Sequence, residues 1–104
     1  KAKEIYYTGR RIKADEALRL GLFNEVVEQG HLQTRTKEVA TQIAKGPPIA
    51  IQHMKENINL ATQADFKECL DREADRLVRA AQTADHKEAV KAFIEKREPI
   101  FKGN

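Results

Sequence analysis

Apolar residues recur three and four positions apart along most of this 104-residue chain, with charged residues between them. This period is typical of amphipathic helices, each with one apolar face. The sequence predicts helices over residues 1–7, 15–20, 32–44, 48–60 and 65–82, and a last one from Asp85 to a stop at Pro99. A short run around Asn24-Glu25, from Leu22 to Val27, instead predicts one brief strand. The expected fold class is therefore mainly α, with about six helical segments and one short strand.

The expected breaks between helices have recognisable chemistry. Gly9 can adopt the left-handed conformation that closes a helix, and Gly46 ends the segment before Pro47-Pro48. Proline is well placed in a first helical turn because its missing amide would have had no partner there. Asp85 with Glu88 three residues later resembles a capping box, so we expect Asp85 to cap the last helix.

Composition favours one surface-rich helical domain over residues 1–104. Apolar residues make up 40% of the chain and charged residues 34%. No apolar run approaches the ~20 residues of a membrane span, so no membrane partner is expected. A single cysteine allows no internal disulfide and favours a reducing compartment such as the cytoplasm. The chain begins with Lys1 inside an apparent helix, and we therefore expect a fragment of a longer protein.

The sequence alone offers no complete active site. There is no serine, which excludes a serine hydrolase, and the histidines lack zinc-ligand spacing. Cys69 lies on an apolar face and is expected to be a small buried residue. The net charge of +3 has its excess near Lys1–Lys13, which leaves weak nucleic-acid binding as a third hypothesis; we expect an ordinary solvated surface. No catalytic or metal-binding residue is predicted.

A resemblance to a known family adds what these patterns do not give. Four motifs occur in the family's order: residues 7–17, 21–27, 43–48 and 83–103, the last reading TADHKEAV, then AFIEKR and PIFKG. The chain thereby resembles the carboxyl-terminal region of the enoyl-CoA hydratase/isomerase (crotonase) family. The resemblance covers essentially all residues. Tyr6, Tyr7 and Phe23 depart from its usual residues and leave the subfamily open.

The resemblance implies a helical carboxyl-terminal domain of a crotonase-like fold whose spiral core is absent from this chain. The oxyanion hole and catalytic carboxylates of the family lie in that spiral, so residues 1–104 alone are expected to be inactive. The implied substrate is a coenzyme A thioester, with no covalently bound cofactor. Phe93 and Lys96 match family positions that approach the adenine and a phosphate of coenzyme A.

The resemblance also implies a homo-oligomer, a trimer or a hexamer, in which this region covers the active site and forms subunit contacts. The parent is most simply a 2-enoyl-CoA hydratase; hydration, isomerisation and the choice of acyl chain stay open. The alternative hypothesis is a stand-alone helical interaction module without catalytic activity.

Overall fold

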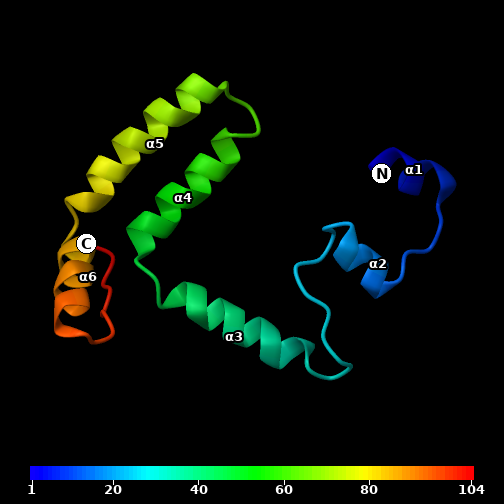
Figure 1. The fold of residues 1–104 in the computed structure, drawn as a ribbon, viewed down its shortest axis with the longest axis horizontal. Coiled ribbons are helices and arrows are strands. Elements are labelled where there is room, and N and C mark those ends of the chain that lie inside the picture. Colours follow the sequence, from blue (N-terminus) through cyan, green and yellow to red (C-terminus); the bar gives the residue numbers. More distant parts are fainter. The chain divides into compact units, whose positions relative to one another are not determined.

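The computed structural model describes all of residues 1–104 and is entirely helical apart from its connections (Figure 1). The helices are α1 (Ala2–Thr8), α2 (Ala14–Arg19), α3 (Leu32–Ala44), α4 (Pro48–Leu60), α5 (Phe66–Ala81) and α6 (Ala84–Glu95). All six expected helical segments are confirmed. None of these helices has the length and apolar character that crossing a membrane requires.

The predicted strand is wrong, since residues 22–27 form no strand. A strand needs the edge of a neighbouring strand to satisfy its backbone hydrogen bonds, and these 104 residues contain none. The segment instead has local contacts: the Leu22 amide donates to the Ala17 carbonyl at 2.9 Å, and the Arg35 guanidinium of α3 donates to the carboxylate of Glu25 at 2.9 Å.

The chain divides into two compact units, Lys1–Glu38 and Val39–Asn104. One helical domain over residues 1–104 therefore stays a prediction. In the first unit, Gly9 closes α1 with a φ of 59°, as expected from its freedom to adopt a left-handed conformation. Arg10 then pairs with Glu16 of α2 at 2.7 Å and with Glu4 of α1 at 3.6 Å, which links the two short helices.

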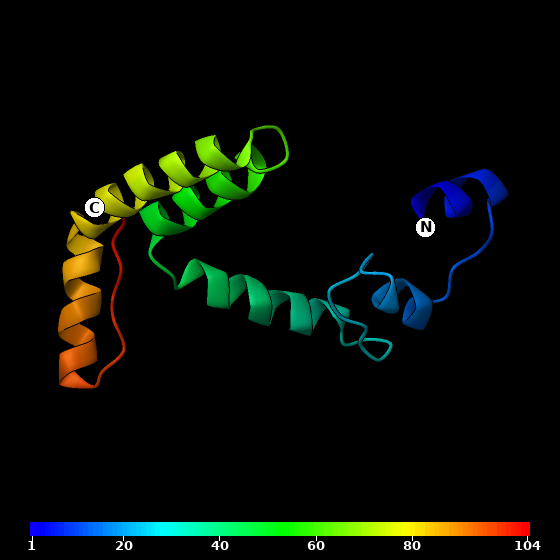
Figure 2. The ribbon, with the colours of Figure 1, turned by 45° about the horizontal axis from the view of Figure 1, so that its top comes forward.

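In the second unit, α4 and α5 run side by side as an antiparallel hairpin, and both views show the tail after α6 returning along that helix (Figures 1 and 2). Pro47 and Pro48 begin α4 as expected. Asp65 caps α5 by accepting the Glu68 amide at 2.8 Å. Arg76 of α5 donates to Glu56 of α4 at 3.0 Å and ties the hairpin together.

The expected cap of α6 is wrong by two residues. Thr83 is the cap, and its hydroxyl accepts the His86 amide at 3.1 Å. Asp85 lies inside the first turn, which frees its carboxylate for another role. Threonine is itself a favoured cap, and this signal competed with the Asp85–Glu88 spacing.

The chain buries very little of its apolar surface. Only Ala17, Ala92 and Asp85 are buried, and none of the large apolar side chains is. The apolar faces of α4, α5 and α6 are instead exposed, at Met54, Ile58, Phe66, Leu70, Leu77, Val90, Phe93 and Ile94. Exposed apolar surface of this extent marks a contact with another part of a protein or with a partner.

Candidate functional site

The two residues proposed for ligand contact lie together at the carboxyl end of α6. Phe93 is in its last turn, and Lys96 directly follows the helix. Phe93 is 85% exposed, so the chain itself does not bury it in the apolar stripe of Ala89 and Val90. Lys96 is exposed and forms no ion pair. A free ring and a free ammonium can meet an aromatic base and a phosphate.

Lys96 has an unusual backbone. Its φ of 54° and ψ of 41° are left-handed, and it is the one residue other than glycine with a positive φ. The Arg97 amide donates to the Ala92 carbonyl at 3.0 Å, and the Lys96 amide donates to the Phe93 carbonyl at 3.3 Å. These two bonds form the Schellman turn that ends many helices, usually with glycine where Lys96 stands. Backbone strain of this kind is concentrated at functional sites.

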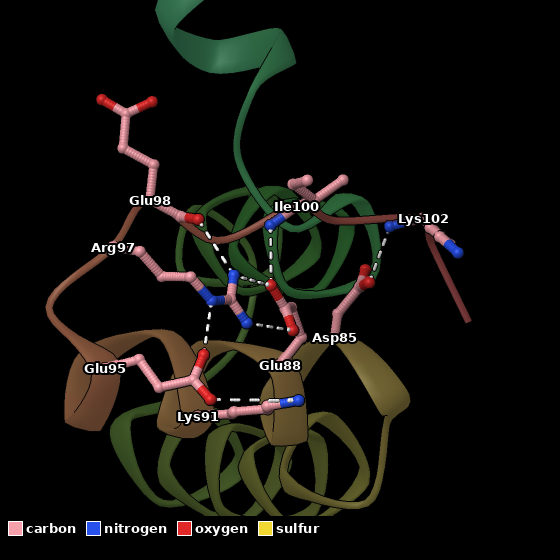
Figure 3. A network of polar contacts seen from close by, with 8 residues as sticks. All are labelled: Asp85, Glu88, Lys91, Glu95, Arg97, Glu98, Ile100 and Lys102. Carbon is pink, nitrogen blue, oxygen red and sulfur yellow. Dashed lines mark hydrogen bonds and ion pairs between the residues drawn. The ribbon is translucent and has the colours of Figure 1, made fainter.

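The residue after Lys96 is held by an ion-pair network (Figure 3). The Arg97 guanidinium donates to both carboxylate oxygens of Glu88, at 2.6 and 3.0 Å. It also donates to the Glu95 carboxylate at 2.6 Å and to the Glu98 carbonyl at 3.1 Å. Glu88 in turn accepts the Ile100 amide at 3.1 Å. One carboxylate on α6 thus binds the tail through both a side chain and the backbone.

This network changes the acidity of Glu88. Donation from Arg97, and then from the Ile100 amide, lowers the pKa of the Glu88 carboxyl to about 2. Donation to Glu88, and then to Glu95, raises the pKa of Arg97. Because folding lowers the pKa of Glu88 from its usual 4.5, its contribution to stability is complete above about pH 4.5 and disappears as the pH falls toward 2. Both groups are therefore charged at neutral pH.

A second carboxylate holds the end of the tail. Asp85 is only 3% exposed, and its two oxygens accept the amides of Lys102 at 2.7 Å and Gly103 at 2.8 Å. Its own amide donates to the Asn104 carbonyl at 3.1 Å. We call Asp85, Glu88 and Arg97, with the tail amides they bind, the tail clamp. The sequence does not reveal this clamp, because the spacing of Asp85 and Glu88 also fits a capping box.

The structure supports no metal-binding or catalytic role for the other residues considered from the sequence. No group of three His, Cys, Asp or Glu side chains is placed to hold a metal ion. Cys69 is half-buried rather than buried as expected. The acidic and basic residues of α5 form pairs along the helix surface, such as Lys67 with Asp71 at 2.8 Å and Arg79 with Asp75 at 2.9 Å. A shallow apolar groove also follows the junction of α3 and α4, lined by Ile43, Ile51, Met54 and Ile58.

Comparison with known proteins gives a consistent result. The family model described as enoyl-CoA hydratase/isomerase matches residues 1–104. A short-chain-enoyl-CoA hydratase of Clostridium acetobutylicum is 43% identical over 96 residues, which is 92% of this chain. A crotonyl-CoA hydratase of Syntrophomonas wolfei is 37% identical over 100 residues, which is 96% of this chain. The crystal structure of an enoyl-CoA hydratase from Bacillus anthracis superposes on 99% of this chain with a TM-score of 0.94 and 41% identity.

The similarity covers only part of each of these proteins. The chain spans 37% of the Clostridium protein, 38% of the Syntrophomonas protein and 40% of the Bacillus anthracis structure. The matched proteins are therefore more than twice as long as the residues described in this structure.

Proposed function

The chain belongs to the enoyl-CoA hydratase/isomerase family, and from this we propose that it is the carboxyl-terminal helical part of an enzyme acting on 2-enoyl-CoA thioesters. Lys96 is proposed to contact a phosphate of coenzyme A and Phe93 its adenine. The observation that carries this assignment is the exposed side chain of Lys96 on a strained, left-handed backbone, three residues after Phe93, which is 85% exposed.

Catalysis itself is proposed to need residues beyond this chain. A pocket on α5 is lined by several carboxylates, but these follow the open surface of a single helix, and two of them, Asp71 and Asp75, are paired with Lys67 and Arg79. Such a solvated surface does not hold a general acid and a general base on either side of one substrate. We therefore propose that residues 1–104 alone have no hydratase activity, and that the acyl chain is selected elsewhere in the enzyme.

The apolar surface suggests what else this part does. Phe66 of α5 is 82% exposed and Ile58 of α4 is 69% exposed, so both would be costly to leave in water. We propose that these helices cover the active site and form contacts within a homo-oligomer. A stand-alone helical interaction module is the second candidate, and the same exposed faces favour it.

The ligand contact is tested in the full-length enzyme with two substrates. Lys96→Ala is expected to raise KM for a short-chain 2-enoyl-CoA about tenfold, because one charge-assisted hydrogen bond is lost, and to leave kcat unchanged. The same enoyl group on pantetheine lacks the nucleotide, so its KM should not change. Lys87→Ala removes an equal charge from the other end of α6 and is the matched control. An unchanged KM for the coenzyme A thioester in Lys96→Ala would contradict the assignment.

A further inference from the structure

We propose that Glu88 and Arg97 are positioning residues, which hold the backbone of Lys96 in its left-handed conformation so that its ammonium is presented to the phosphate of the ligand. This inference rests on the ligand contact proposed for Lys96. It adds the physical reason why a lysine, rather than glycine, can occupy this position.

The side chain of Lys96 does not hold its backbone in the left-handed conformation. Its side chain has no ion pair, and a side chain with a Cβ disfavours a positive φ. The restraint comes from the residue that follows. The Arg97 amide is bonded to the Ala92 carbonyl, and the Arg97 guanidinium is bonded to Glu88 and Glu95 on α6. The backbone amide and the guanidinium of Arg97 are thus both bonded to α6, the helix that ends directly before Lys96.

Glu88 also holds the chain further along the tail. Glu88 Oε1 accepts both an Arg97 guanidinium N–H at 2.6 Å and the Ile100 amide at 3.1 Å. The same carboxylate therefore binds the chain one residue and four residues after Lys96. Figure 3 shows both contacts converging on Glu88 while the side chain of Glu98 turns away from the network. Lys96 lies at the start of a turn that one α6 side chain ties down.

A restrained backbone at Lys96 favours binding of an anion. A lysine side chain loses considerable rotamer freedom when it binds, and a mobile backbone would add to that loss. Fixing the backbone beforehand lowers the entropic cost of contacting an anion. The electrostatic effect of Glu88 alone has the opposite sign, since a carboxylate near a phosphate weakens binding. Removing Glu88 therefore distinguishes positioning from simple charge.

The experiment uses Glu88→Gln in the full-length enzyme, with Glu98→Gln as the matched control. Both remove one negative charge from the same region, but the Glu98 side chain has no partner in the clamp. Glu88→Gln is expected to raise KM for the short-chain 2-enoyl-CoA about threefold, with kcat unchanged and KM for the pantetheine thioester unchanged. Glu98→Gln should leave KM the same or slightly lower. In a Lys96→Ala background, Glu88→Gln should have no further effect on KM.

The other outcomes distinguish failure of the positioning role of Glu88 from failure of the ligand contact of Lys96. If Lys96→Ala raises KM but Glu88→Gln does not, the positioning role is overturned and the ligand contact stands. If Lys96→Ala has no effect, the ligand contact and the inference that rests on it both fail. Equal losses with both thioesters would show a purely structural role for Glu88 and overturn the inference. Should Glu88→Gln fail to fold, Arg97→Lys keeps the charge but loses the bidentate geometry, and the same rise in KM is expected.

Discussion

The α4–α5 hairpin and the α6 segment with its tail lie in the same compact unit, yet they are held in opposite ways. The hairpin exposes apolar side chains on both helices, and its described cross-links are the contacts of Arg76 with Glu56 and Asn57. The α6 segment contains two of the three buried residues of the chain, Asp85 and Ala92. Its tail is bound through three backbone amides.

The α6 tail is held by polar contacts within the chain, whereas the apolar faces of the α4–α5 hairpin depend on a surface outside these residues. Apolar burial is the main favourable term in folding, and the hairpin obtains little of it within these residues. The tail clamp instead satisfies its polar groups locally, through Asp85 and Glu88, while Val90, Phe93 and Ile94 of α6 stay exposed. Phe93 and Lys96, the residues proposed to contact the ligand, lie on the part with the local polar contacts, which suits a site that has to keep its shape.

The largest expected effect is on the clamp. Asp85→Ala removes the acceptor of two backbone amides and leaves both without a partner. Amide hydrogen exchange at Lys102 and Gly103 in the full-length protein is expected to become about 30- to 100-fold faster, since each lost bond involves a charged acceptor. Exchange in α4 and α5 should not change. Unchanged exchange in the tail would show that the tail is held by contacts other than Asp85.

A smaller effect is expected on the hairpin. Arg76→Ala removes the ion pair with Glu56 and the contact with Asn57, which join α4 to α5. Exchange in the facing turns of the two helices should become about tenfold faster, with the tail unaffected. Arg79→Ala is the control, because Arg79 pairs only within α5, with Asp75, and the loss of such an exposed pair should be nearly neutral. Equal increases in amide exchange in the two variants would show that Arg76 does not specifically join α4 to α5.

How far the sequence predicted this molecule depends on the range of the contacts involved. The six helices follow from apolar periodicity, from Gly9 and from Pro47-Pro48, all of which act within a few residues. Family membership was also correctly predicted, from four ordered motifs. The prediction of a strand at residues 22–27 was wrong because a strand forms only beside a neighbouring strand, and the local pattern of apolar residues carries no information about such a neighbour.

The clamp could not be predicted for a related reason. Asp85 contacts residues 17 and 18 positions away, and Glu88 contacts Arg97 nine positions away. Local spacing offered a capping box as a complete explanation for both carboxylates. Likewise Phe93 fitted an apolar stripe, and only the structure shows that the chain leaves it exposed. Phe93 and Lys96 stay predictions as ligand contacts, while their placement at one end of α6 is observed.

The smallest effect reverses the direction of the others and separates stability from binding at one residue. Lys96→Gly relieves the strain of a left-handed lysine, although the glycine also gains freedom in the unfolded chain. The balance is expected to slow amide exchange of the tail by about two- to fivefold, because glycine is the residue that this helix-ending turn prefers. The variant also loses its ammonium, so its KM for the coenzyme A thioester should rise as in Lys96→Ala. A tail that is more protected while the ligand binds less tightly would mean that Lys96 is kept for binding at the expense of the fold. Faster exchange would instead show that the lysine side chain itself stabilises the turn.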